Sequence, residues 1–297
     1  MNILIIDTKL MVYTNFHRGQ NITKMLDDVA NLYTRVIGKA PDKIIFAMDK
    51  GKSKRADVFP AYKAQRKEYL LTRPKAYQDS VKAFSEKYKK FEYFLKAFAN
   101  VIAIDGVEAD DVASILSESS LAQEGHIYLL SSDADWCKLI GPNVSVLHPG
   151  KGLEITEANI EAIQGYTIRE KILLDRYAGV AKENVPGLKR FGPKTFKKIW
   201  QEQGEDEDKV RDIIIEKHSK KLPEGYESID DLYHFNAELL RPFKYSDLST
   251  EEQTLLIEGV NNRETYTFGE ALEYSYTYLA ELYTPAPHLV DFYRIKY

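Results

Sequence analysis

The chain has 297 residues, of which 44% are hydrophobic and 29% charged, and its formal net charge is −4. This composition is typical of a globular intracellular protein with one large domain or two smaller ones. No apolar run approaches the roughly eighteen residues of a membrane span, and the N-terminal apolar run is too short for a secretory signal. The single cysteine, Cys137, excludes an internal disulfide and a cysteine-based zinc site. We expect a cytoplasmic monomer without a membrane partner.

Strand and helix signals alternate up to about residue 140, a pattern that favours βαβ units around a mostly parallel sheet. Apolar, β-branched runs predict strands that are buried on both faces of such a sheet. The predicted strands are 3–6, 44–48, 101–104, 127–130 and a short one at 144–147. Apolar residues at helical spacing predict helices over 21–37 and 108–117. The expected fold class is therefore α/β.

The rest of the chain is predicted to be helical. Residues 62–98 mix lysines with aromatic residues and lack a strand signal, and Pro74 is expected to divide them into two helical pieces. A helical pattern begins near Thr167, and a further helix is predicted over 194–200. The acidic stretch 202–208 is the best linker candidate. These signals divide the chain into a core over 1–166, a smaller helical element over 167–204 and a helical C-terminal region over 205–297.

The predicted strands deliver carboxylates to one edge of the sheet. In open α/β sheets the ligand site lies outside the carboxyl ends of the strands. The acids that follow these strands are Asp7, Asp49, Glu108, Asp110, Asp111, Asp133 and Asp135. Like charges this close repel strongly unless cations neutralise them. Hard divalent cations with oxygen ligands, magnesium first among them, are the natural partners.

Spacing divides these acids into two groups. Glu108 and Asp111 are three residues apart, so on a helix they share a face, and with the acids after the first two strands they could surround one cation. Asp133 and Asp135 flank one residue, so in extended chain they point the same way and suit a second cation. Two metals about 4 Å apart can stabilise both oxygens of a phosphodiester displacement. A lone aspartate after a strand is more often a helix cap or turn former, but four strand ends that converge make coincidence a poorer explanation.

Positive charge is concentrated in two stretches although the net charge is negative. Residues 50–75 carry nine basic residues against two acidic ones, and residues 182–198 carry six against one. Basic stretches beside an acidic metal pocket suggest a polyanionic substrate that is held by its phosphates. A single charge run favours a solvated surface, but two such runs in a chain of negative net charge fit a solvated surface and a substrate-binding surface about equally well.

Six short motifs occur in a specific order and spacing. They are Ile6-Asp7, Phe46-Ala47-Met48-Asp49, Tyr62-Lys63-Ala64-Gln65-Arg66, Gly106-Val107-Glu108-Ala109-Asp110-Asp111, Ser132-Asp133-Ala134-Asp135 and the segment 183–195. Each motif is weak alone, but together they resemble the 5′-nuclease family of flap endonucleases and 5′→3′ exonucleases, and the small phage members most of all. The resemblance covers roughly residues 1–200. It implies a PIN-like nuclease core with a central, mostly parallel sheet, a helical arch and a helix-hairpin-helix element.

The resemblance implies a role for each matched residue. The first metal would be held by Asp7, Asp49, Glu108, Asp110 and Asp111, some of them through water. The second would be held by Asp133, Asp135 and Glu183. Magnesium is the implied ion, and manganese should substitute for it. Lys63 and Arg66 match a basic pair at the foot of the arch, where they would contact the scissile phosphate and stabilise charge in the transition state.

The arch and the hairpin would contact DNA. Residues 63–95 would form an arch through which a single-stranded 5′ end passes. Its aromatic side chains would stack on bases, and its lysines would contact the phosphate backbone. Alternatively, these aromatics pack the arch helices together. The hairpin Gly187–Lys194 would present backbone N–H groups and a helix N-terminus to a duplex phosphate. The expected DNA contacts are Lys54, Arg55, Lys67, Gly187, Arg190, Gly192, Lys194 and Thr195.

Two departures from the family pattern concern metal ions. The hairpin often holds a potassium ion in this family, and Arg190 stands where the pattern usually has glycine, so a positive φ there would strain the chain. Upstream, Val180 replaces an acid expected at the second metal, and Glu183 replaces another with a longer side chain. The second site should therefore bind its metal more weakly. Asp175 is a candidate substitute that lies five residues from Val180.

The resemblance implies metal-dependent hydrolysis of phosphodiester bonds at 5′ ends, flaps or junctions of DNA, or of RNA primers on DNA, in replication or repair. A branched-DNA-binding protein of the same fold, with weak or no cleavage because of its eroded second site, is the alternative. A phosphatase of the haloacid dehalogenase type would need an acid where Lys9 stands, and a Toprim domain has no place for the motif at 62–66. A polymerase or a single-strand-binding protein is a candidate partner.

Overall fold

The computed structural model describes residues 1–20, 22–96, 99–261, 289 and 292–293. The chain forms two compact units, and neither is continuous in sequence. The first unit comprises residues 1–53, 74–159 and 242–297, and the second comprises residues 54–73 and 160–241. Among the described helices, none has the length and apolar character needed to cross a membrane.

The first unit is built around a six-stranded sheet with the strand order β3-β2-β1-β4-β5-β6. The strands are β1 (Asn2–Asp7), β2 (Lys43–Ala47), β3 (Asn100–Ile102), β4 (His126–Leu130), β5 (Val144–His148) and β6 (Leu153–Ile155). The first five pair in parallel, and β6 pairs antiparallel with β5. The α/β class with a mostly parallel sheet is thus confirmed, and so are the five predicted strands.

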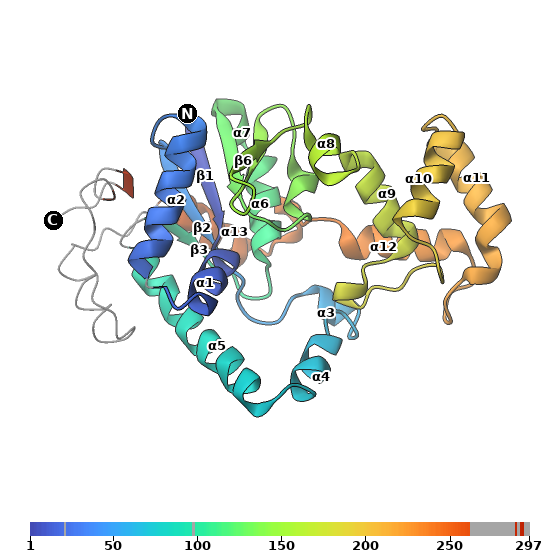
Figure 1. Ribbon diagram of the computed structural model, residues 1–297, viewed down its shortest axis with the longest axis horizontal. Helices are drawn as coiled ribbons and strands as arrows, with labels where there is room; N and C mark the ends of the chain where they lie inside the picture. Colours follow the sequence, from blue (N-terminus) through green and yellow to red (C-terminus); the bar gives the residue numbers. More distant parts are fainter. Residues whose placement is uncertain (21, 97–98, 262–288, 290–291, 294–297) are drawn as a thin grey trace. The chain divides into compact units, whose positions relative to one another are not determined.

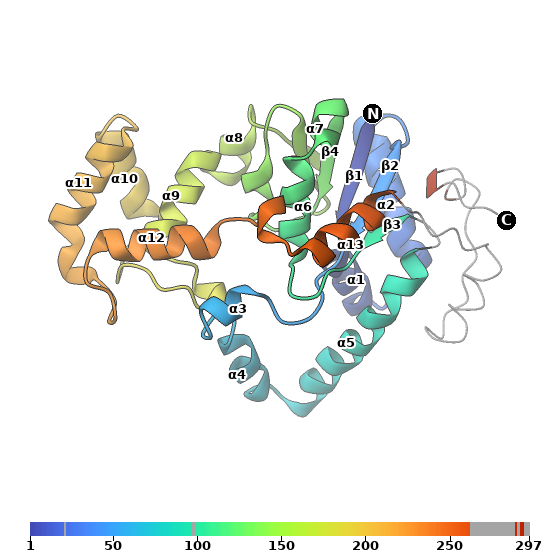
Figure 2. The same ribbon diagram turned by 180° about the vertical axis from the view of Figure 1, so that it is seen from behind.

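Helices cover both faces of this sheet, which explains why its central strands are apolar throughout. In β1, all four residues from Ile3 to Ile6 are fully buried, as expected for a strand with no solvent-facing side. Figures 1 and 2 show α2 over one face and α6 over the opposite face. The helices of this unit are α1 (Thr8–His17), α2 (Ile22–Ile37), α5 (Lys75–Leu95), α6 (Ala109–Ser117), α7 (Ser120–Glu124) and α13 (Thr250–Asn261).

The order in which successive strands are added to the sheet reverses at β1. From this strand the sheet extends through β2 and β3 on one side, and through β4 and β5 on the other. The register places Asp7 opposite Ala47 of β2, and Ile6 opposite Leu130 of β4, so the three strands end at the same edge. Such a reversal is the place where open α/β sheets bind their ligands.

A short 3₁₀ turn, η1 (Trp136–Leu139), follows β4. It carries Cys137, the only cysteine of the chain. The side chain of Cys137 is buried, with 2% of its surface exposed.

The second unit is helical. Its helices are α3 (Arg55–Val58), α4 (Gln65–Leu71), α8 (Ile160–Gln164), α9 (Ile168–Ala178), α10 (Pro193–Glu202), α11 (Glu207–His218) and α12 (Ile229–Leu240), with 3₁₀ turns η2 (Ala181–Glu183) and η3 (Ser219–Lys221). Four of them, α9 to α12, enclose a core that includes Leu173, Trp200, Ile214 and Leu232. Pro74 separates α4 from α5, as predicted.

Local signals explain where the helices of this unit begin and how they are joined. Thr167 caps α9 and forms a capping box with Glu170, which satisfies backbone N–H groups at the helix start. The side-chain amide of Asn236 on α12 donates to the carbonyl oxygens of Arg176 and Pro186, at 2.9 and 2.8 Å. The fully buried Asn236 therefore ties α12 to the end of α9 and to the segment before the hairpin.

Candidate active site

Asp7 ends β1 and also caps α1. Its Oδ1 accepts the N–H of Leu10 at 3.1 Å, and its Oδ2 accepts the hydroxyl of Ser131 at 2.8 Å. Burial, helped by the nearby charges of Asp49 and Asp133, raises the pKa of this carboxyl to about 6, although its two hydrogen bonds lower it. The capping role and the predicted metal role thus fall on the same side chain. A carboxylate that is costly to ionise next to other acids would gain from a cation.

Asp49 follows β2 and fixes the start of the helix that carries the next acids. Its Oδ1 accepts the N–H of Ala109, the first residue of α6, at 2.8 Å. Its Oδ2 lies 2.9 Å from the ammonium group of Lys9. Lys9 thereby places a positive charge at the acidic edge, and the sequence analysis did not anticipate this contact.

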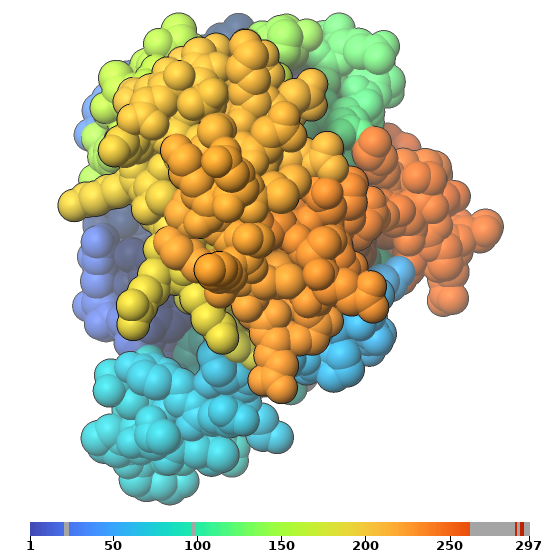
Figure 3. Space-filling model, turned by 90° about the vertical axis from the view of Figure 1, so that its right-hand side faces the viewer, coloured from blue at the N-terminus to red at the C-terminus, as the bar shows by residue number. Residues whose placement is uncertain are grey.

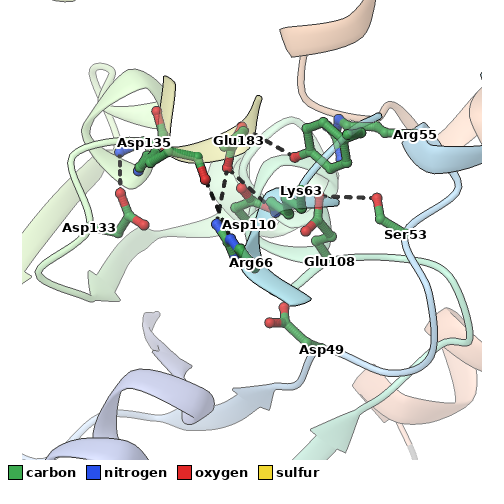
Figure 4. Close-up of polar contacts among 12 residues, drawn as sticks. Asp49, Ser53, Arg55, Lys63, Arg66, Glu108, Asp110, Asp133, Asp135 and Glu183 are labelled. Carbon is green, nitrogen blue, oxygen red and sulfur yellow. Dashed lines mark hydrogen bonds and ion pairs between the residues drawn. The ribbon is translucent and has the colours of Figure 1, made fainter. Parts of the chain in front are cut away.

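The first turn of α6 carries a compact acidic cluster. Carboxylate oxygens of Glu108, Asp110 and Asp111 lie within 4.8 Å of one another, a spacing at which one cation can be shared. Glu108 caps the helix, and its Oε2 accepts the hydroxyl of Ser53 at 3.2 Å (Figure 4). The structure therefore brings together three of the acids that the sequence predicts for the first metal site, those at the start of this helix.

Asp111 differs from its neighbours because it is fully buried. Its Oδ2 accepts the N–H of Glu108 at 3.4 Å, which completes a capping box, and its Oδ1 accepts the N–H of Phe243 at 2.9 Å. Both oxygens are thus hydrogen-bonded to backbone groups. This geometry gives Asp111 a part in positioning the cluster, in addition to the ligand role predicted for it.

The second acidic pair lies in the loop between β4 and η1. The N–H of Asp133 donates to the hydroxyl of Ser131 at 3.1 Å, so one serine connects Asp133 with Asp7. Asp135 lies 2.8 Å from the ammonium group of Lys138. Sequence reasoning missed the parts of Ser131 and Lys138. The position of Ser131 directly after a buried strand was the one available signal.

Within the second unit, Lys63 and Arg66 both lie close to Glu183. One carboxylate oxygen of Glu183 lies 3.4 Å from the Lys63 ammonium and 3.9 Å from the Arg66 guanidinium, and the other accepts the hydroxyl of Tyr62 at 3.3 Å (Figure 4). The N–H of Lys63 also donates to the carbonyl oxygen of Glu183 at 2.8 Å. Lys63 has a φ of 56°, a left-handed conformation that is uncommon for lysine. The predicted catalytic pair is thus held by an acid that was predicted as a metal ligand.

Three other predicted residues have structural partners in this unit. Val180 packs in an apolar cluster with Tyr62 and Leu239, and Asp175 forms an ion pair with Lys171. The guanidinium of Arg55 is buried and donates to the carbonyl oxygens of Leu239 and Arg241, each at 2.9 Å. Arg55 therefore anchors α3, which differs from the DNA contact that its place in the basic stretch predicts.

The predicted hairpin is compact at its base and exposed at its tip. A Cβ on Gly187 would lie 1.9 Å from the carbonyl oxygen of Ala178, so only glycine permits this approach. At the tip, Arg190 has a φ of 55°, the strained conformation that the comparison with glycine anticipated. Gly192 then caps α10, and the exposed Lys194 lies in its first turn. Lys67, on α4, is also exposed.

Comparison with known proteins adds independent information. Residues 2–171 match a family described as "5′-3′ exonuclease, N-terminal resolvase-like domain". A DNA polymerase I from Rhizobium leguminosarum is 25% identical over 256 residues, which are 85% of this chain and 24% of the polymerase. A 5′-3′ exonuclease from Buchnera aphidicola is 28% identical over 207 residues, 65% of this chain and 68% of that protein. A bacteriophage T5 flap endonuclease, solved with DNA and metal ions, has the same fold, with a TM-score of 0.63 at 21% identity over 99% of each chain.

Proposed function

The chain belongs to the 5′-3′ exonuclease family that its residues 2–171 match, and from this premise we propose that it is a metal-dependent nuclease acting at 5′ ends and flaps of DNA. The acidic edge of the sheet is the observation that carries the proposal. Three strands end there, Asp7 and Asp49 follow two of them, and Asp49 bonds to the start of α6, which carries the acidic cluster. RNA primers on DNA present the same kind of 5′ end and are proposed as further substrates.

The donors at this edge fit a hard divalent cation. They are carboxylate and hydroxyl oxygens, and burial together with the charges of Asp49 and Asp133 raises the pKa of Asp7, so a cation would relieve the cost of its charged form. We assign the first metal to Asp7, Asp49, Glu108 and Asp110, with Asp111 holding the helix start, and the second to Asp133 and Asp135. Magnesium is the proposed ion and manganese its substitute, since both favour oxygen ligands. Such ions neutralise charge that develops on phosphate oxygens during hydrolysis.

Lys63 and Arg66 are proposed to contact the phosphate that is cleaved. Both cations are fixed by Glu183, so their side chains lose less freedom when a phosphate binds. Glu183 remains a predicted ligand of the second metal, but its two ion pairs and its bond from Tyr62 support a different role for it, that of positioning the basic pair.

One observation favours the second candidate function. Val180, which stands where the family pattern has an acid, is packed among apolar side chains and adds no oxygen to a metal site. Asp175, the candidate substitute for that acid, forms an ion pair with Lys171. A protein with only the first site filled would bind branched DNA and cleave it slowly or not at all.

Cleavage of a 5′-labelled flap substrate separates the two functions. Purified protein with Mg²⁺ or Mn²⁺ should release short 5′ products, and Asp133→Asn should slow their release at least about 100-fold, the upper end of what loss of a supporting group at a metal site costs. Asp105→Asn is the matched control, because Asp105 is an exposed acid in the turn after β3. Binding without cleavage under either metal would establish the DNA-binding alternative.

A further inference from the structure

Six lysines and arginines in residues 160–241 form neither an ion pair nor a side-chain hydrogen bond. In residues 160–241, all of which the structure describes, most lysines and arginines form ion pairs or hydrogen bonds. Examples are Lys198 with Glu202, Lys209 with Asp206 and Arg211 with Asp230. The cations that lack such a partner are Lys189, Arg190, Lys194, Lys217, Lys220 and Lys221. Acids are therefore available in this unit, but they pair with other cations.

These six residues belong to two segments. Lys189, Arg190 and Lys194 lie in the hairpin and the first turn of α10, where the family resemblance already predicts contact with DNA. The other three lie at the end of α11 and in η3, a part of the chain to which the sequence assigned no chemistry. We call Lys217, Lys220 and Lys221 the basic strip.

The basic strip is attached to the hairpin by direct contacts. The N–H of Lys189 donates to the carbonyl oxygen of Lys221 at 2.8 Å. The ring of Phe191 meets the ring of His218 edge-on, with their centroids 5.0 Å apart. Burial lowers the pKa of the His218 imidazole, and so do the charges of Lys221 and Lys217. The strip and the hairpin therefore form one continuous positive region.

We propose that the basic strip binds the phosphate backbone of duplex DNA next to the hairpin and so lengthens the duplex contact of this protein. The proposal rests on the proposed function in naming DNA as the polyanion. Uncompensated ammonium groups in a cluster raise the local potential, and they release counterions from a nucleic acid when they neutralise its phosphates. Lysine acts on phosphate as a point charge, so the contact strengthens binding without reading sequence. This end of the unit, in yellow and orange, faces the viewer in Figure 3.

The salt dependence of binding tests the proposal. The exposed Lys217 and Lys220 are changed together, as Lys217→Gln/Lys220→Gln, and affinity for a flap substrate with a long duplex arm is measured in EDTA over a range of salt concentrations. The slope of log K against log salt should become shallower by about two, because each lost phosphate contact removes about 0.9. The matched control is Lys198→Gln/Lys209→Gln, two exposed lysines of the same unit that are paired with acids. The control should keep the slope of the parent protein.

Three outcomes would overturn the proposal: an unchanged slope in Lys217→Gln/Lys220→Gln, an equal loss in the control, or an equal loss of affinity for single-stranded DNA. The charge-reversed Lys217→Glu/Lys220→Glu should enlarge the effect on duplex binding. Cleavage by the parent protein is measured separately with Mn²⁺. If the parent protein binds the duplex but does not cleave it, the nuclease assignment is wrong, while the proposal that the basic strip binds DNA is unaffected. If the parent protein cleaves DNA but Lys217→Gln/Lys220→Gln keeps the parent slope, the proposal for the basic strip is wrong and the nuclease assignment is kept.

Discussion

Asp7 shows how one residue combines a structural and a chemical role. Its carboxylate caps α1, where negative charge is favoured by the helix dipole, and it also lies among acids that repel it. Repulsion and burial outweigh the capping interaction, because the pKa of Asp7 rises from an ordinary 3.8 to about 6. The charged form of this side chain is therefore a cost to the metal-free fold.

Asp7→Asn should stabilise the protein when metal is absent. Because the folded pKa lies above the ordinary value, the carboxyl stabilises the fold most below pH 3.8, and this stability is lost as the pH rises through about 6. At neutral pH the variant should gain on the order of 3 kcal/mol in unfolding free energy, since a pKa rise from 3.8 to about 6 corresponds to about 1.36 kcal/mol per pKa unit. Thermal melting in EDTA should show this gain shrinking as the pH falls below about 6 and nearly vanishing below about pH 4.

The control for this variant is again Asp105→Asn, which removes an exposed carboxylate and should leave the melting temperature nearly unchanged. Saturating Mg²⁺ should stabilise the parent protein but not Asp7→Asn. A variant that melts lower than the parent at every pH in EDTA would show that the bonds to Leu10 and Ser131 dominate, contrary to this prediction.

Arg190 is a second residue whose backbone conflicts with its side chain. A left-handed conformation costs about 1–2 kcal/mol for a residue with a Cβ, and glycine avoids this cost. Lys63, Asn184 and Glu205 share the conformation, with φ between 56° and 62°. Lys63 and Arg190 are both predicted to contact DNA, so strain coincides with proposed function at these two positions.

Arg190→Gly should raise the unfolding free energy by up to about 1 kcal/mol, once the greater freedom of glycine in the unfolded chain is subtracted. Urea denaturation measures this change. Lys189→Gly, one residue earlier in the hairpin and without a positive φ, should instead lower stability by about 0.5–1 kcal/mol. If both variants lose the same stability, the strain assigned to Arg190 is absent.

At the scale of elements, α6 serves as the frame for the acidic cluster. Asp49 fixes its first N–H group, and Asp111 joins its start to Phe243, a residue 132 positions later in the chain. Asp110 and Asp111, which are neighbours in one helical turn, therefore differ in their roles. Asp110 is partly exposed to solvent, whereas Asp111 is fully buried and both of its oxygens accept backbone N–H groups.

Substitution of these two neighbours should separate metal binding from stability. Asp111→Asn turns an amide NH₂ toward a backbone N–H, so it should cost about 1–3 kcal/mol of unfolding free energy. Asp110→Asn can keep its bond to the Asp111 N–H through Oδ1, so it should stay near parent stability but bind Mn²⁺ more weakly. Urea denaturation and Mn²⁺ titration calorimetry, performed on both variants, measure the two effects. Equal stability losses would contradict this division of roles.

The elements of the sheet could be predicted because each central strand is a continuous apolar run. The strand β6 could not, since Leu153–Ile155 contains only three residues, one of them Glu154. Contacts between residues far apart in the sequence could not be predicted from it either. Nothing in the order of residues indicated that Asp111 would accept the N–H of Phe243, or that Glu183 would pair with Lys63. The identity of the acids was thus predictable, but not their partners.

At the scale of the molecule, the chain passes between its two units four times, after residues 53, 73, 159 and 241. The basic segment 54–73 therefore belongs to the second unit, although the residues before and after it belong to the first. The predicted boundary at residue 204 separates α12 from α9, although the structure joins these helices through Asn236. Residues 205–297 were predicted to be one helical region, and the described part of that region contributes to both units.

A chain shortened to residues 1–204 should not form the second unit. It would lack α11 and α12, and with them Ile214, Leu232 and Asn236, which fill the core or satisfy buried carbonyl groups. Limited proteolysis should then cleave it within 160–204, while a chain of residues 1–261 resists cleavage there. Protection of 160–204 in the shorter chain would show that the hairpin folds without α12.

Cys137 gives this protein a practical advantage for measurement. The only thiol of the chain is enclosed in η1 of the first unit, so reagents in solution reach it poorly. A cysteine introduced at an exposed position of either unit would consequently be the preferred site for a spin label or a fluorophore. Pairs of such labels, one on each unit, would act as a molecular ruler and would measure the distance between the units with and without added DNA.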